Sequence, residues 1–247
     1  ASNICKTISN RLIVTDTNRW ARLGKFRSKA TIVQNVPEDP GKHLSRNLPT
    51  GATKVFVTGA MSTRRGLAQI LQAVEQTPET TIVAAGMPSD EFAAETFVKH
   101  PRVDYRGVVT PRQSLELAAQ CDAVFAFYEP SCENHLFASP NKLFDGMSVG
   151  RPVIINSEVK MSELADRLRV GLLCKYHDAE GLRSIVASLP AQRENLPAFA
   201  EMARRSFLED HSWERMESLI ADLYASLDDS TNKSHYKTAA SPKPKAA

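Results

Sequence analysis

The stretch FASPNKLFDGMSVGRPVI, residues 137–154, carries the signals of a helix that leads directly into a strand. Ser139 belongs to the residue types that cap helix N-termini, and Pro140 suits the first helical position because its missing N–H needs no partner there. Gly150 and then Pro152 supply the matching stop, after which the run becomes apolar and β-branched. The stretch therefore predicts a helix and, immediately after it, a buried strand.

Two faces can be assigned to this helix. Leu143 and Met147 lie one turn apart and form its apolar face, while Asn141, Lys142 and Asp145 project together from the other side. A diphosphate bound at the helix N-terminus would place an attached ribose or sugar hydroxyl near the carboxylate. The structural alternative is an intrahelical Lys142–Asp145 pair, which stabilises a helix by about 0.2–0.5 kcal/mol.

Outward from this stretch, short apolar runs alternate with segments of helical period from residue 53 onward. Such alternation is typical of β-α units that build a parallel sheet with helices on both faces. The sequence thus predicts an α/β fold with a doubly wound, Rossmann-like parallel sheet, and a C-terminal helix pair that breaks near His211. Six strands are expected, at 54–58, 81–85, 103–105, 123–127, 153–156 and 171–174, with helices between the first two and at 90–99, 112–120, 140–149, 162–169 and 179–189.

Three parts can be distinguished along the chain. Residues 1–50 are expected to be a remnant of an N-terminal domain with its linker, and residues 51–229 the main domain. Residues 230–247 are predicted to be a disordered basic tail, since they are mostly Ser, Thr, Lys, Pro and Ala. The chain opens without Met in a helix-like segment, so we expect it to belong to a longer protein. The expected elements of the first part are strands at 11–15 and 31–34, a basic helix at 17–26 and a linker over 35–51.

Composition narrows the function classes. With 42% hydrophobic and 24% charged residues the chain has ordinary globular values. The net charge of +3 arises in the tail, because without its four lysines 27 basic residues face 28 acidic ones, so no nucleic-acid partner is expected. Four cysteines without a C-x-x-C pair favour a reduced, cytoplasmic chain without a metal site. No apolar run approaches the roughly 18 residues of a membrane helix.

Three glycines stand at the ends of predicted strands, at the sheet edge where open α/β folds bind ligands. Gly59, Gly86 and Gly107 each directly follow, or nearly follow, a strand. A single glycine often only turns the chain. Three at one edge indicate that the backbone approaches something closely there.

The loop after the first strand reads GAMSTRRG, residues 59–66, and opens a helix. It matches neither G-x-G-x-x-G nor G-x-x-x-x-G-K-[ST], which argues against a nicotinamide dehydrogenase and a P-loop ATPase. Arg64 and Arg65 add positive charge to a helix N-terminus that is already positive, at a cost of a few tenths to about 1 kcal/mol each. A bound anion would relieve this repulsion, so the loop predicts phosphate binding; the alternative is that both arginines point into solvent.

These motifs together resemble a known family. The run SPNKLFDGMSVGRPVI is similar to the S-P-x-K-L-F-E-x-M-A-x-G-x-P-V-I signature of the retaining, GT-B-fold glycosyltransferases of family 4. The resemblance extends over residues 11–227, and the S-P-x-K stretch is its most specific part. Other pieces follow the family's order: Asn35-Val36-Pro37, Arg65-Gly66, Gly107-Val108-Val109, Ser212-Trp213-Glu214 and Leu223-Tyr224.

The resemblance implies a donor-binding domain that holds a nucleotide-diphosphate sugar and passes the sugar, with retained configuration, to an acceptor hydroxyl in polysaccharide or glycoconjugate synthesis. Fixed cations and helix dipoles would stabilise the departing diphosphate, so neither a cofactor nor a metal is expected. The acceptor, a sugar or a lipid-linked molecule, would bind through the missing N-terminal domain, and this chain alone is expected to bind nucleotide with little transfer activity. The implied residues are Gly59, Arg64, Arg65, Ser139, Asn141 and Lys142 for the phosphates, and Gly107, Val108, Val109 and Asp145 for the base and ribose.

Two positions depart from the family's pattern. Its E-x7-E pair would place an acid at Phe137, and the second acid is shortened here to Asp145. Glu133 is our candidate replacement, so Glu133 and Asp145 are the candidate catalytic carboxylates; the alternative is that Glu133 is a solvated loop acid. The family's first-loop Gly-Arg has Ala60 at its second position, and Arg64 would have to supply the missing contact.

These departures leave the base and the sugar open. Two alternatives to a transferase remain, a noncatalytic nucleotide-binding or interaction module of the same fold and a sugar-nucleotide epimerase. The predicted helix at 17–26 also sets Trp20 among Arg19, Arg22 and Lys25, which suits contact with the inner face of an acidic membrane. An ordinary helix with a solvated basic face has the same pattern.

Overall fold

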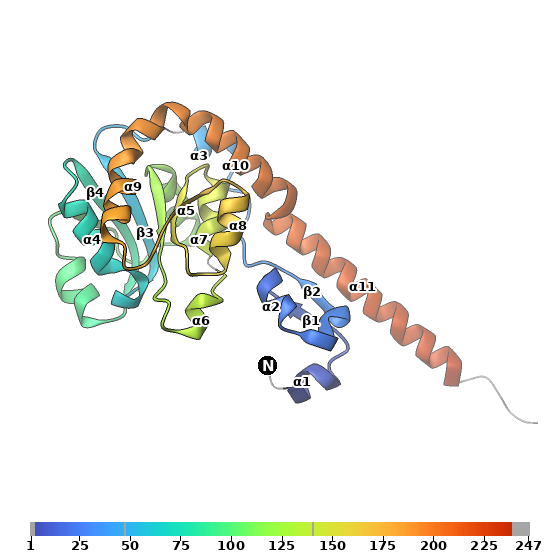
Figure 1. Ribbon diagram of the computed structural model, residues 1–247. Coiled ribbons are helices and arrows are strands. Elements are labelled where there is room, and N and C mark those ends of the chain that lie inside the picture. The colour runs from blue at the N-terminus through green and yellow to red at the C-terminus, as the bar shows by residue number, and fades with distance from the viewer. Residues whose placement is uncertain (1–2, 47, 140, 239–247) are drawn as a thin grey trace, which may run out of the picture. The chain divides into compact units, whose positions relative to one another are not determined.

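The computed structural model describes residues 3–46, 48–139 and 141–238. The chain divides into two compact units. One is Asn35–Trp213, and the other consists of Ala1–Gln34 together with Glu214–Ala247. The larger unit carries the predicted sheet (Figure 1).

All six strands of this sheet are parallel, in the order β5-β4-β3-β6-β7-β8. The chain thus builds the sheet outward from β3 to one edge and then returns to build from β6 to the other. The carboxyl ends of β3 and β6 form the switch point at which such sheets bind ligands. The strands are β3 Thr53–Met61, β4 Thr80–Pro88, β5 Val103–Tyr105, β6 Ala123–Ala126, β7 Val153–Asn156 and β8 Gly171–Cys174.

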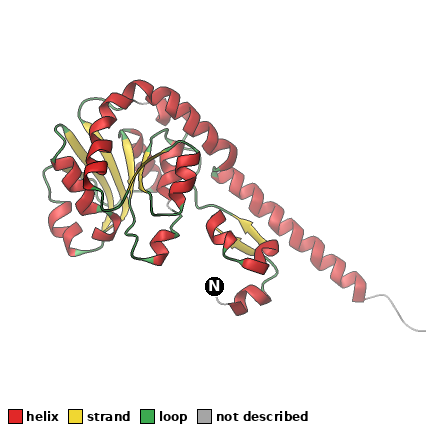
Figure 2. Cartoon of the chain, viewed as in Figure 1, coloured by secondary structure: helices red, strands yellow, loops and turns green. Residues whose placement is uncertain are grey.

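Helices cover both faces of the sheet (Figure 2). Successive strand residues enter two different hydrophobic cores, one on each face. Phe56 and Val124 pack with α5, α7, α8 and α10, whereas Val57 and Phe125 pack with α4 and α9. This alternation is what a strand buried on both faces requires, and it confirms the predicted doubly wound α/β fold. The helices are α4 Leu67–Glu75, α5 Pro111–Ala119, α6 Glu133–Leu136, α7 Asn141–Ser148, α8 Met161–Arg167, α9 Ala179–Gln192 and α10 Leu196–Asp210.

Three local expectations are corrected. β3 and β4 run past their glycines, because Gly59 and Gly86 pair in register and continue the ladder. The segment expected as a bare linker contains a helix, α3 Lys42–Arg46, because Leu44 is buried in the core. Phe92–Phe97 is a π-helix rather than a regular α-helix.

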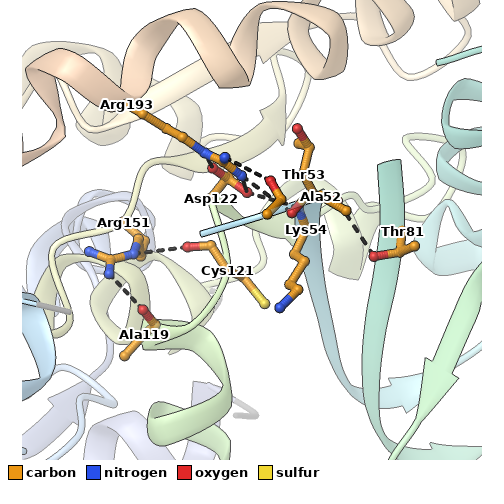
Figure 3. A network of polar contacts seen from close by, with 10 residues as sticks. Ala52, Thr53, Lys54, Thr81, Ala119, Cys121, Asp122, Arg151 and Arg193 are labelled. Carbon is orange, nitrogen blue, oxygen red and sulfur yellow. Dashed lines mark hydrogen bonds and ion pairs between the residues drawn. The ribbon is translucent and has the colours of Figure 1, made fainter. Parts of the chain in front are cut away.

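The amino edge of the sheet is tied together by two arginines (Figure 3). Arg151 is fully buried and donates to the carbonyls of Ala119 and Cys121, at 2.6 and 2.9 Å, and to those of Val149 and Gly150. It thereby joins the chain leaving α5 to the chain leaving α7. Burial lowers the pKa of Arg151 to about 10.

The second of these arginines, Arg193, contacts the carboxylate of Asp122 with both Nε and Nη2, at 2.6 and 3.0 Å. It also donates to the carbonyl of Gly51. Asp122 in turn accepts the N–H of Lys54 at 2.8 Å. The start of β6 is therefore fixed to the start of β3, at the edge opposite the carboxyl ends of the strands.

The smaller unit contains the two expected early strands, β1 Leu12–Val14 and β2 Ala30–Ile32, paired in parallel. The predicted helix between them is shorter than expected: α2 Thr17–Ala21 is followed by the 3₁₀ helix η1 Gly24–Lys29, because Gly24 adopts a φ of +56°. The unit also includes α1 Asn3–Ile8 and most of α11 Trp213–Thr238. The tail was expected to be disordered from residue 230, but helix α11 continues to Thr238. Residues 230–237 contain no Pro or Gly that would end a helix. The rest of the tail, 239–247, lies outside the described residues.

Candidate functional site

The carboxyl edge of β3, β4 and β5 is built from glycine backbone. A Cβ on Gly86 would lie 2.0 Å from the carbonyl oxygen of Gly59, and the Gly86 N–H donates to the Gly107 carbonyl at 2.8 Å. All three glycines have positive φ, from +69° to +142°. Position 86 must therefore be glycine because the backbone of β3 leaves no room for a side chain there. The sequence pattern alone had suggested that the backbone at this glycine approaches a ligand.

The two arginines of the first loop lie on the 3₁₀ helix η2 Thr63–Arg65, one residue before α4. Gly66 follows with a φ of +72°, and a Cβ there would come within 2.7 Å of Phe127 Cβ. At the other end of η2, the N–H and hydroxyl of Thr63 donate to Asp90 at 2.7 and 2.8 Å. Burial alone would raise the pKa of Asp90, but these hydrogen bonds and one from Ala93 lower it. Both ends of the turn are thus fixed.

Arg64 and Arg65 have different surroundings. Arg64 is exposed and its Nε lies 3.4 Å from Oε2 of Glu129, with which it forms an ion pair. The guanidinium of Arg65 instead lies over the ring of Tyr128, 4.3 Å from its centroid. Among the residues that the structure describes, Arg65 forms no ion pair, and its guanidinium is stabilised by the cation–π contact with this ring.

Lys142, in the first turn of α7, reaches the same place from the other side of the switch point. Its Nζ lies 3.3 Å from the point where a Cβ on Gly59 would be. Lys142 and Arg65 line one narrow pocket, whose other lining residues are Val57, Thr58, Ala60, Met61, Leu67, Phe125, Ala126, Phe127 and Tyr128. The first loop and the SPNK stretch therefore meet at a common pocket between β3 and β6.

Asp145 lies one turn further along α7 and is partly buried. Desolvation raises its pKa to about 7, against the opposing effect of Lys142. No ion pair joins Lys142 to Asp145, although both are described, so the simple intrahelical pair is not formed. A carboxyl group with this pKa changes charge near neutral pH and can both donate and accept hydrogen bonds there.

The N-terminus of α7 is described apart from Pro140, which lies outside the described residues. The hydroxyl oxygen of Ser139 is buried and has no hydrogen-bond partner in the described part of the chain. Asn141 is exposed at the first helical position. Ser139 thus has an unused hydrogen-bonding group beside the end of α7.

The remaining predicted residues lie outside the lining of the Arg65–Lys142 pocket. Glu133 is exposed at the start of the four-residue helix α6, and Phe137 directly follows that helix. Gly107, Val108 and Val109 follow β5, and Val108 is 77% exposed. Their assignments to the sugar and the base stay predictions.

Sequence reasoning missed the residues that support Arg65. Tyr128 is almost fully buried beneath it, and His135 packs edge-on against the same ring, 5.9 Å between centroids. Burial and the charge of Arg65 lower the pKa of His135. The available signal was position alone, since Tyr128 directly follows the strand predicted at 123–127, at the switch point.

Comparison with known protein families identifies the family of this chain. A family model described as glycosyl transferase-like matches residues 64–221. The chain belongs to this glycosyl transferase-like family. No curated protein sequence matches it.

Solved structures of glycosyltransferases share the fold of this family member. HepE of Anabaena, in complex with UDP and glucose, has a TM-score of 0.72 and 14% identity, over 91% of this chain and 65% of its own. A sucrose-phosphate synthase from Thermosynechococcus elongatus has a TM-score of 0.69 and 17% identity, over 92% and 61% respectively. TarM of S. aureus, in complex with UDP and other ligands, has a TM-score of 0.67 and 15% identity, over 89% and 45%. The family member thus has the GT-B-type fold and spans less than two thirds of each of these chains.

Over residues 3–46, 48–139 and 141–238, no three His, Cys, Asp or Glu side chains gather in a way that could hold a metal ion. Within the same ranges, no helix combines the length and the apolar character needed to cross a membrane.

Proposed function

We propose that this chain is the donor-binding half of a retaining GT-B glycosyltransferase of the family 4 type. It would bind a nucleotide-diphosphate sugar for transfer to an acceptor hydroxyl in polysaccharide or glycoconjugate synthesis. The observation that carries the proposal is the convergence of Arg65 and Lys142 on one pocket at the sheet's switch point. The pocket is narrow, so the diphosphate would lie at its mouth and contact both cations.

The geometry around Lys142 supports a phosphate position between the two loops. The absence of a side chain at Gly59 leaves room for the Lys142 ammonium beside the backbone. The unpartnered hydroxyl of Ser139, together with Asn141 and the N-terminal amides of α7, would complete the set of donors. These groups would stabilise negative charge as the nucleoside diphosphate departs, without a metal or cofactor.

The rest of the donor is assigned by its attachment to the diphosphate. Asp145, one turn from Lys142, would accept a hydrogen bond from a ribose hydroxyl. Gly107, Val108 and Val109 would lie against the base, which the large exposed surface of Val108 supports. Glu133 would contact the sugar, and retention of configuration rests on the resemblance of the SPNK stretch to its family.

Calorimetry on the full chain tests the proposal. UDP, GDP and their sugars are titrated into the wild type, Arg65→Ala and Lys142→Ala. Each substitution removes a charge-assisted hydrogen bond of about 1.5–3 kcal/mol, which weakens binding roughly tenfold to a hundredfold. Arg112→Ala is the matched control, since Arg112 is exposed on α5 and forms an ion pair with Glu116 four residues on.

Two outcomes would contradict the donor-site assignment. One is that no nucleotide binds at millimolar concentration, and the other is that both substitutions leave affinity unchanged. The alternatives separate by product: an epimerase converts a nucleotide sugar without an acceptor, and a noncatalytic module converts none in the complete protein.

Peripheral membrane contact is a further part of the proposal. Arg22, Lys25 and Arg27 are exposed in the smaller unit, and Arg27 lies over the ring of Trp20. Contact with an anionic surface would rest on these charges and would fall with salt. Sedimentation with vesicles of anionic and of zwitterionic lipid tests this, and equal binding to both would contradict it.

A further inference from the structure

A buried asparagine holds the backbone of Tyr128, the residue whose ring lies beneath Arg65. Asn156, the last residue of β7, is fully buried. Its Oδ1 accepts the Tyr128 N–H at 2.9 Å, and its Nδ2 donates to the Tyr128 carbonyl at 3.1 Å. A side chain that satisfies both backbone groups of one residue fixes that residue's position and rotation.

A second chain of contacts starts at the same asparagine and ends on the turn that carries Arg65. Nδ2 of Asn156 also lies 3.0 Å from Oε2 of Glu158. Both oxygens of Glu158 accept the backbone N–H of Tyr176, at 3.0 and 3.2 Å. The hydroxyl of Tyr176 then donates to the carbonyl of Thr63, the first residue of η2, at 3.1 Å.

Glu158 is suited to a charged role at this point. Burial alone would raise its pKa, but the hydrogen bonds from Asn156 and Tyr176, with the charge of His177, lower it. The group therefore stays a carboxylate at neutral pH and keeps both acceptors. The ring of Tyr176 also packs 5.9 Å from that of Phe127, the neighbour of Tyr128.

We propose that Asn156, Glu158 and Tyr176 are positioning residues that hold Arg65 ready for the donor diphosphate. We call these three residues the brace. Its first arm, Asn156, holds Tyr128, whose ring lies under the Arg65 guanidinium. Its second arm, Glu158 and Tyr176, holds the backbone turn from which Arg65 projects. The inference rests on the proposed function, because Arg65 is the phosphate cation only if the donor site is where we assign it. A preformed site binds more tightly since the long arginine side chain need not be ordered during binding.

A purely structural role for the brace makes a different prediction. Loss of one hydrogen bond would then lower the free energy of unfolding and leave the affinity for pyrophosphate unchanged. Alternatively, it would change that affinity by the same factor whether or not Arg65 is present. Positioning through Arg65 predicts that the effect on affinity disappears when Arg65 is removed, because two residues that act through one group are not additive.

The test uses Tyr176→Phe, which removes one hydroxyl and keeps the ring. UDP and inorganic pyrophosphate are titrated into the full chain by calorimetry, in the wild-type and Arg65→Ala backgrounds. We expect Tyr176→Phe to weaken both ligands about three- to tenfold in the wild type, the value of one hydrogen bond, and to have no effect in Arg65→Ala.

Tyr105→Phe is the matched control. It also removes a tyrosine hydroxyl that donates to a backbone carbonyl at a strand end, that of Gly86 at 2.8 Å, but Tyr105 lies on β5, at the edge of the sheet away from β7. Its affinity for pyrophosphate should equal that of the wild type.

A second variant examines the other arm. Asn156→Asp keeps the size of the side chain and the acceptor for the Tyr128 N–H, but replaces the donor that faces the Tyr128 carbonyl and Glu158. It should weaken pyrophosphate binding more than Tyr176→Phe does. Thermal melting shows whether it folds, and if it does not, Tyr176→Phe decides the question.

The outcomes separate the two proposals. If Arg65→Ala weakens UDP binding while Tyr176→Phe does not, or if Tyr176→Phe acts equally in both backgrounds, the brace is refuted and the donor site stands. If the wild type binds neither UDP nor pyrophosphate, both proposals are wrong.

Discussion

The pKa of Asp145 leads to a measurable dependence of stability on pH. In the folded chain this carboxyl group stays protonated up to about pH 7, whereas in the unfolded chain it ionises near 3.8. Between these values the unfolded state has already lost the proton and the folded state has not. The free energy of unfolding should therefore fall as the pH rises from about 4 to about 7, and Asp145→Asn should abolish this contribution.

The size of the effect follows from the same two values. A difference of about three pKa units corresponds to about 4 kcal/mol of differential stabilisation. Asp145 retains some contact with solvent, which screens the effect, so we expect about half of this, roughly 2 kcal/mol, between pH 5 and pH 8. Asn cannot ionise and occupies the same volume, so the variant should be the more stable protein at pH 8.

Urea unfolding at pH 5 and pH 8, followed by circular dichroism, measures this difference. The quantity to compare is the change in unfolding free energy between the two pH values for wild type and variant, since the contributions of other groups are common to both. Asp166→Asn, at an exposed carboxylate on α8, controls for the loss of a negative charge. Parallel pH profiles for wild type and Asp145→Asn would refute the reasoning.

Two stability predictions follow from other parts of the larger unit. Arg151→Met leaves four carbonyls without their donor, so it should lower the free energy of unfolding, measured in urea, by about 3–5 kcal/mol. Arg112→Met, which removes an exposed ion pair, should change it by no more than about 0.5 kcal/mol. Similar losses in the two variants would contradict the bridging role of Arg151. Gly86→Ala would place a methyl group 2.0 Å from the Gly59 carbonyl and should cost more than about 3 kcal/mol or prevent folding. Gly51→Ala, in open space at a φ of +71°, should cost only about 1–2 kcal/mol. A mild effect of Gly86→Ala would mean that the two strands can separate.

The sheet could be predicted from the sequence because its signals are local. Strands buried on both faces are short apolar runs, and the three predicted at 103–105, 153–156 and 171–174 match β5, β7 and β8 residue for residue. The misplaced ends have a different cause. β3 continues through Gly59 because β4 offers a partner glycine in register, and a pairing across 27 residues leaves no trace in either strand alone.

The part of the candidate site that could be predicted also has local signals in the sequence. Lys142 and Arg65 stand out in the sequence since each places a cation at or near the N-terminus of a helix. Tyr128, Asn156 and Tyr176 do not stand out, because an aromatic or an amide at a strand end has many ordinary uses. Their role depends on contacts between segments far apart in the chain, such as the bond from Tyr176 to Thr63.

Arg64 and Arg65 show how the fold distinguishes two residues that the sequence cannot rank. Their partners are also consecutive, Glu129 and Tyr128, in the segment that leaves β6. The Glu129 N–H donates to the Arg64 carbonyl at 2.9 Å, which aligns the two segments. Arg64 is thereby neutralised by a partly buried carboxylate, while Arg65 is directed over an aromatic ring that leaves its N–H donors available. The cation available to an anion is thus selected by the residue order after β6.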